Sequence, residues 1–149
     1  MRLIYYRGRT RNFGDELNGA LWLRVAPELF AAPEAPADET GFLGIGTIIG
    51  MPTPGLRFLH VFSSGVGYDS VADWAMPRRV WCVRGPLSAQ ALGLGPEAAL
   101  TDGAILTPVG TGLRRPAAPT GGIGVMPHWD SLDHGDWDRA CTLAGMRLI

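Results

Sequence analysis

Residues 3–25, LIYYRGRTRNFGDELNGALWLRV, carry the pattern that decides the fold. The apolar run Leu3–Tyr6 has the length of a buried strand, and it stops at a loop rich in arginine and glycine, Arg7 to Gly14. Asp15 is placed to cap a following helix, and Glu16 is favourable in its first turn. An apolar stripe at helical spacing comes next, made of Leu17, Ala20, Leu21 and Val25. The stretch therefore predicts a strand, a polar loop and a helix.

The same order of elements recurs along the chain. Pro86 stands at the first position of a short helix that Gly93 ends, and Asp136–Leu143 has a helical pattern. Residues 31–40 have the composition of a loop. Further apolar runs suited to strands are Phe42–Ile49, Leu56–Phe62, Val80–Val83, Ala98–Leu100, Ile123–Met126 and Met146–Ile149. Repeated units of this kind predict an α/β fold with a mainly parallel, Rossmann-like sheet flanked by helices.

Composition narrows the functional classes. The chain has 149 residues, 46% of them hydrophobic and 18% charged, which is typical of one globular domain. The net charge of -1 gives no general attraction to nucleic acid or anionic lipid. All 13 basic residues are arginine, so lysine Schiff-base chemistry and a phosphate-loop lysine are excluded. Cys82 and Cys141 lie far apart, and no apolar run has the ~20 residues of a membrane span. We therefore expect a cytoplasmic protein with free thiols.

The first polar loop is the most informative candidate site. Ligands of parallel α/β sheets bind at the carboxyl ends of the strands, where the loop Asn12–Asn18 is expected to lie. A carboxylate in this loop can accept a proton from a sugar hydroxyl. Arg7, Arg9 and Arg11 precede the helix start, where they either hold a phosphate or carboxylate or form a solvated basic loop.

His128 is a second candidate, because it follows a strand and stands between Pro127 and Trp129. An imidazole suits acid–base work near neutral pH, and an indole offers a flat face to a sugar ring. The alternative is a histidine that is hydrogen-bonded into its loop.

Familiar metal and cofactor motifs do not match. Asp136-Trp137-Asp138 has the DxD pattern of metal-dependent glycosyltransferases, but it stands at a helix start, where helix charging is the favoured interpretation. Gly44–Gly50 has its third glycine one residue too late for a dinucleotide fingerprint. The sequence contains no HExxH or GxSxG motif and no cysteine–histidine cluster, so neither a metal nor a cofactor is expected.

Several blocks taken together resemble the polysaccharide pyruvyltransferase family, especially its succinoglycan-type branch. The blocks occur in the family's order over nearly the whole chain, and they are Asn12–Asn18, Phe42–Ile48, Ser64–Tyr68, Val83–Ser88, Thr101–Ala104 and Met126–Trp129. The resemblance implies the amino-terminal lobe of a two-lobed, GT-B-like fold. Residues 1–149 would form that single lobe, a second lobe or crossover would start near Ile123, and the carboxy-terminal lobe would be missing.

The resemblance also implies an activity. It is the transfer of a pyruvyl group from phosphoenolpyruvate onto two hydroxyls of a sugar in an exopolysaccharide repeat unit, which forms a cyclic ketal. The acceptor would be lipid-linked at the inner face of the cytoplasmic membrane, with the protein associating peripherally. The chain by itself would be an incomplete enzyme. Two alternatives stay open, namely a lobe of a nucleotide-sugar glycosyltransferase and a non-catalytic, glycan-binding remnant.

Three residues would carry the chemistry under this hypothesis. Asp15 would act as a base or orient a hydroxyl. Arg84 would clamp an anion, or else fix its loop through an ion pair, and His128 would be a secondary contact near the cleft. Substrate-binding residues are expected along the same sheet edge, namely Asn12, Gly14, Glu16, Asn18, Gly46, Ser64 and Gly67. These assignments require the polar turns after successive strands to converge.

Overall fold

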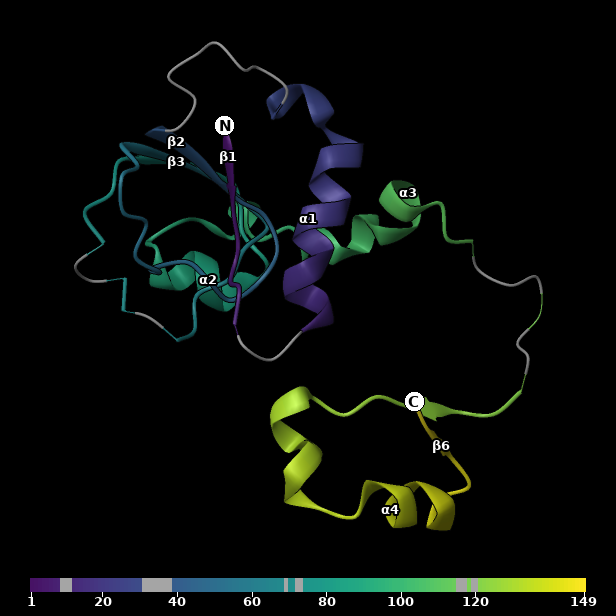
Figure 1. Cartoon of the computed structure of the whole chain (residues 1–149). Coiled ribbons are helices and arrows are strands. Elements are labelled where there is room, and N and C mark those ends of the chain that lie inside the picture. The colour runs from purple at the N-terminus through teal and green to yellow at the C-terminus, as the bar shows by residue number, and fades with distance from the viewer. Residues whose placement is uncertain (9–11, 31–38, 69, 72–73, 115–117, 119–120) are drawn as a thin grey trace. The chain divides into compact units, whose positions relative to one another are not determined.

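The structure of the protein, a computed structural model, divides the chain into two compact units, Met1–Leu113 and Arg114–Ile149 (Figure 1). It describes residues 1–8, 12–30, 39–68, 70–71, 74–114, 118 and 121–149. Most of the predicted loop 31–40 therefore lies outside the described residues, as do Arg9 and Arg11. The expected start of a second lobe near Ile123 stays a prediction.

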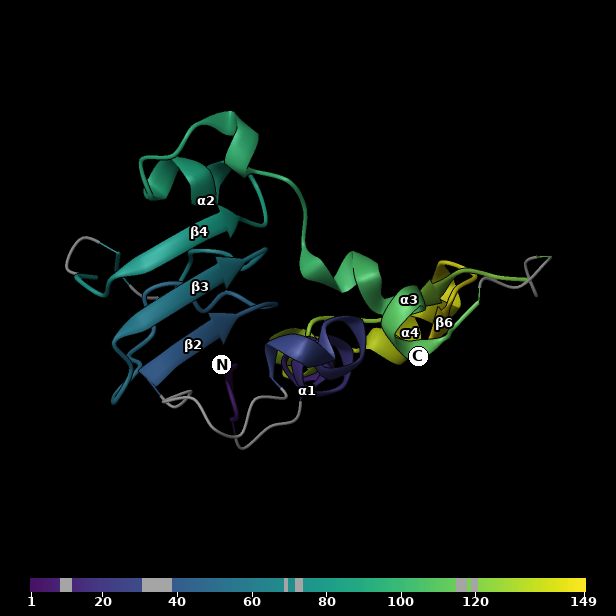
Figure 2. The ribbon, with the colours of Figure 1, turned by 90° about the horizontal axis from the view of Figure 1, so that it is seen from above.

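A four-stranded parallel sheet with the order β1-β2-β3-β4 forms the centre of the first unit. Its strands are β1 (Arg2–Ile4), β2 (Thr40–Leu43), β3 (Phe58–Phe62) and β4 (Arg78–Cys82). The arrowheads of β2, β3 and β4 point the same way in Figure 2. The predicted α/β fold with a parallel, Rossmann-like sheet is confirmed. The predicted strand Ala98–Leu100 is wrong, because this segment contributes only an isolated bridge between Val83 and Ala99.

Helices cover both faces of this sheet. The helices of the first unit are α1 (Phe13–Val25), α2 (Pro86–Ala91) and α3 (Thr107–Thr111), with 3-10 turns η1 (Pro27–Leu29), η3 (Pro96–Ala98) and η4 (Gly103–Leu106). Helix α1 buries Leu21 and Trp22 against Phe42 of β2. Helix α2 packs Ala89 against a second apolar cluster that includes Leu43 of β2. Because neighbouring residues of a strand point to opposite faces, α1 and α2 lie on opposite sides of the sheet (Figure 1).

The start and the buried face of α1 differ from the prediction. Asn12, not Asp15, is the N-cap, and its Oδ1 accepts a hydrogen bond from the Gly14 N–H at 3.0 Å. Asp15 instead lies in the first turn of α1, so its side chain is not the one that caps the helix. The buried face of α1 includes Asn18 and Trp22, which the predicted apolar stripe did not contain. Ala20, which the prediction placed in that stripe, is exposed.

The second unit is small. Its strands β5 (Gly124–Val125) and β6 (Arg147–Leu148) pair in parallel, and they are joined through η5 (Trp129–His134) and α4 (Trp137–Leu143). The predicted helix and both predicted strands of this region are confirmed, although the strands are shorter. Asp136 caps α4, since its Oδ1 accepts a bond from the Arg139 N–H at 2.9 Å, which supports helix charging for this acidic motif. Across the described residues, no helix has the length and apolar character needed to cross a bilayer.

Candidate functional site

The turns that follow β2, β3 and β4 are joined to one another at the carboxyl edge of the sheet. The Gly65 N–H donates to the Gly46 carbonyl at 2.9 Å, and the Arg84 N–H donates to the Ser64 carbonyl at 2.9 Å. Asp15 stands beside them, because a Cβ added at Gly46 would lie 3.6 Å from Asp15 Oδ1. The structure therefore brings four of the predicted site residues to one edge of the sheet, namely Asp15, Gly46, Ser64 and Arg84.

Asn18 connects α1 to the turn after β2. Its Oδ1 accepts bonds from the Ile45 N–H at 2.9 Å and from the Trp22 indole N–H at 3.0 Å, while its Nδ2 donates to the Ile45 carbonyl at 3.0 Å. The side chain has no exposed surface. Its predicted contact with substrate is therefore replaced by a structural role, in which it fixes the turn beside Asp15.

Ser64 has a comparable position. It is fully buried, and its Oγ donates to the Gly44 carbonyl at 3.0 Å. Its predicted contact with substrate is likewise replaced by a role in holding the turns together. Gly67, by contrast, is exposed at the same edge.

Arg84 is half-buried among these turns. Its Nη1 donates to Thr47 Oγ1 at 2.9 Å, and its guanidinium lies against Gly65, where an added Cβ would collide with Nη2. The glycine at this position therefore allows the guanidinium to lie flat over the turn. A planar cation held in this way presents fixed donors to a phosphate or carboxylate.

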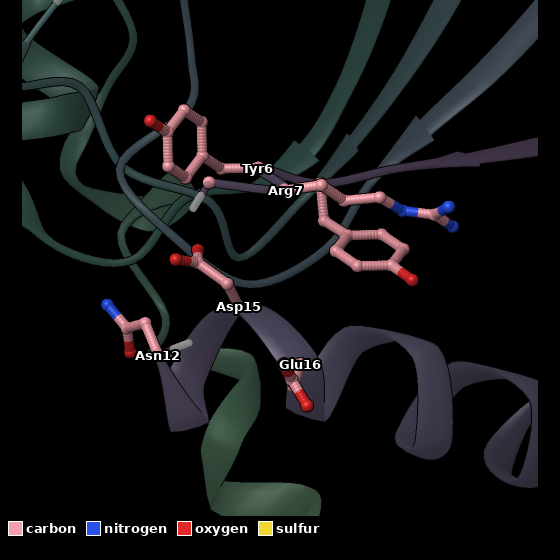
Figure 3. Close-up of a pocket in the computed structure, with 7 residues that line it drawn as sticks. Tyr6, Arg7, Asn12, Asp15 and Glu16 are labelled. Atoms are coloured by element: carbon pink, nitrogen blue, oxygen red, sulfur yellow. The ribbon is translucent and has the colours of Figure 1, made fainter. Parts of the chain in front are cut away.

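A cavity of ≈ 360 Å³ opens at the junction of β1 and α1 (Figure 3). Its lining consists of aromatic, acidic and polar residues, namely Tyr5, Tyr6, Arg7, Gly8, Asn12, Asp15 and Glu16. In Figure 3 the Asp15 carboxylate points away from α1 and toward the loop that carries Tyr6. Partial burial raises the pKa of the Asp15 carboxyl above its usual value of 3.8. The cavity therefore holds a carboxyl group that keeps its proton more readily than one in water.

Three of the predicted binding residues belong to this region. Asn12 and Glu16 line the cavity, and Gly14 lies between them in the first turn of α1. Sequence reasoning missed Tyr5, Tyr6 and Gly8, because an aromatic pair at the end of an apolar run resembles core. Tyr6 is in fact 56% exposed. The glycine two residues after the pair is the signal that could have indicated an exposed ring.

His128 belongs to the second unit, where it caps η5. Its Nδ1 accepts a bond from the Asp130 N–H at 3.3 Å, and the residue is exposed. This capping agrees with the alternative of a histidine bonded into its loop, and its contact at the cleft stays a prediction. Within the described ranges, no group of three or more histidine, cysteine, aspartate or glutamate side chains is placed to hold a metal ion.

Fold and site together define an α/β chain with a parallel, Rossmann-like sheet and an acidic, tyrosine-lined cavity at the carboxyl edge of that sheet. Among curated proteins, the chain is similar to the succinoglycan biosynthesis protein ExoV of Rhizobium meliloti (strain 1021), with 31% identity over 155 aligned positions. The match covers 100% of this chain and 46% of ExoV, so the chain spans about half the length of that relative. The predicted resemblance to the succinoglycan-type branch is confirmed by this match. No protein-family model matches the chain, and no solved structure resembles it significantly.

Proposed function

We propose that the chain is part of an exopolysaccharide-biosynthesis transferase that moves a pyruvyl group from phosphoenolpyruvate to a sugar. The observation that carries this proposal is the Asp15 carboxyl, which lies in a cavity at the carboxyl edge of the sheet. The similarity to ExoV, which extends over all of this chain, supports it. The acceptor would be a lipid-linked oligosaccharide at the inner face of the cytoplasmic membrane, which the protein would approach from the cytoplasm.

Ketal formation needs a balanced set of proton transfers. The methylene carbon of phosphoenolpyruvate takes up a proton, and a sugar hydroxyl attacks the neighbouring carbon. The carbon–oxygen bond to phosphate then breaks, and a second hydroxyl closes the ketal. The two hydroxyl protons are balanced by the new methyl hydrogen and by the departing phosphate. A positioned group that can hold and release a proton accelerates such steps.

Asp15 has the environment for this role. Its raised pKa brings the carboxyl closer to the pH at which a group can both accept and return a proton. Asn18 holds the turn after β2 in place through its hydrogen bonds to the Ile45 backbone. The Asp15 carboxyl therefore lies beside a fixed segment of backbone. We propose that Asp15 accepts the proton of the attacking hydroxyl.

Arg84 supplies the complementary charge at the same edge. Its guanidinium is held by Thr47 and lies over Gly65, so it is oriented before any ligand arrives. We propose that it binds the phosphate or carboxylate of the donor and stabilises the charge that develops as phosphate leaves.

The test is a comparison of donors. The chain, alone and mixed with the remaining half of ExoV, is incubated with a lipid-linked oligosaccharide and either phosphoenolpyruvate or a nucleotide-sugar. The proposal expects inorganic phosphate together with a ketal methyl signal by NMR. Release of a nucleoside diphosphate would favour a glycosyltransferase lobe, and binding of the oligosaccharide without any product would favour a non-catalytic domain.

Variants locate the activity within the chain. Asp15→Asn should abolish ketal formation while the protein stays folded. The matched control is Asp133→Asn, which removes an exposed carboxyl in the second unit and should leave the rate unchanged. Full activity of Asp15→Asn would remove this carboxyl from the mechanism.

A further inference from the structure

We propose that Tyr6 is a sugar-stacking side chain, which lines the same cavity as the Asp15 carboxyl and covers one face of the acceptor sugar. The proposal deepens the proposed function and rests on it for the identity of the acceptor. It concerns a residue that no motif marks, at the junction of β1 and α1 (Figure 3).

The ring of Tyr6 is both exposed and backed by the chain. It is 56% exposed and lies two residues beyond the end of β1. A Cβ added at Gly8 would lie 2.5 Å from Tyr6 Cε1, so this glycine lets the ring rest against the loop backbone. A ring that is supported on one side and open on the other loses little conformational entropy when a ligand stacks on it.

The neighbouring residue, Tyr5, packs against other parts of the chain. The guanidinium of Arg7 lies over the Tyr5 ring at 4.6 Å from its centroid, and a Cβ added at Gly19 of α1 would lie 3.1 Å from the Tyr5 hydroxyl. Successive side chains of an extended segment point to opposite sides. Tyr5 therefore packs toward α1, whereas Tyr6 remains available to a ligand.

The polar groups of the cavity suit hydroxyls. Asp15 and Glu16 place carboxylates on the lining, and Asn12 adds an amide. Carboxylates accept hydrogen bonds from hydroxyl groups, and an aromatic face covers the apolar side of a pyranose ring. The volume of ≈ 360 Å³ falls within the range of about 300–1,000 Å³ of small-ligand sites.

The experiment measures glycoside binding by saturation-transfer NMR titration of the full chain. The probes are methyl β-D-glucopyranoside, methyl β-D-galactopyranoside and, separately, phosphoenolpyruvate. Tyr6→Ala should weaken glycoside binding by about tenfold, which is the size expected for a lost aromatic stacking contact, while Tyr6→Phe should stay close to the parent chain. Tyr68→Ala is the matched control, because Tyr68 is 82% exposed and lies outside the cavity lining.

Each outcome decides the proposal. Thermal unfolding of both Tyr6 variants at the parent temperature shows that any loss of binding is local. Binding of neither glycoside, equal binding by Tyr6→Ala, or an equal loss in Tyr68→Ala would overturn it. An equal loss of phosphoenolpyruvate binding in Tyr6→Ala would show that the effect is not specific to the sugar and would also overturn the proposal. Tyr6-dependent glycoside binding without phosphate release from phosphoenolpyruvate would instead count against the proposed function alone.

Discussion

The two units differ in how completely they bury their apolar side chains. In Met1–Leu113, core residues such as Leu21, Leu43 and Val61 have no exposed surface. In Arg114–Ile149, Cys141 is buried, but Leu143 is 79% exposed. A chain segment of fewer than about 40 residues rarely closes a core without help. The comparison teaches that a rigid site can be built on the first unit, and the acidic cavity lies there.

The sharpest way to break this comparison is to separate the units. A fragment covering Met1–Leu113 should unfold cooperatively at nearly the temperature of the full chain, because its core is complete. A peptide covering Arg114–Ile149 should show no cooperative transition in circular dichroism. A cooperative peptide, or a first fragment that fails to fold, would contradict the comparison.

The Asn18 network should give the largest effect of a single substitution. Asn18→Ala leaves the Trp22 indole N–H and two backbone groups of Ile45 buried without partners. The loss should be at least about 3 kcal/mol in the free energy of unfolding, measured by urea denaturation. Leu143→Ala, in the second unit, should change it by less than about 0.5 kcal/mol because that side chain is exposed. Similar effects at both positions would show that the two units are equally well packed.

The elements of the first unit could be predicted from the sequence, whereas the roles of individual polar residues could not. Apolar runs and proline and glycine positions follow local rules, so the four strands and α2 were predicted near their true places. Asn18 looked like a ligand contact because its partner, Ile45, comes 27 positions later and only the fold brings them together. Tyr6 looked like core, since strand patterns do not show where a sheet edge opens.

Ser63→Gly should change the free energy of unfolding less than Asn18→Ala does, and in the opposite direction. The Ser63 φ of 59° lies in the left-handed region, and within the described part of the chain its buried Oγ has no hydrogen-bond partner. Ser63→Gly should therefore raise the free energy of unfolding by about 1 kcal/mol, after allowing for the greater freedom of glycine in the unfolded chain. The adjacent Ser64→Gly is the control, and it should lower stability because it removes the bond to Gly44. Destabilisation by both would show that Ser63 is not strained.

The smallest effect concerns the pH dependence that Asp15 contributes. Burial raises the pKa of this carboxyl above its unfolded value of 3.8, so the folded chain binds the proton more tightly than the unfolded chain. Its contribution to stability is therefore present below pH 3.8 and is lost as the pH rises through the higher, folded pKa. Asp15→Asn should match the parent chain in acid and melt slightly higher above that window, as followed by thermal unfolding at several pH values. A parent chain that gains stability over the same window would indicate a lowered pKa.

The central claim is that a sugar binds to the first unit, at the cavity that contains Asp15 and Tyr6. Its most direct test is to record backbone amide shifts of the isotope-labelled full chain while adding methyl β-D-glucopyranoside. The account predicts saturable shifts at Asn12, Asp15 and Tyr6. Shifts confined to Arg114–Ile149, or none at Asp15 and Tyr6, would contradict it.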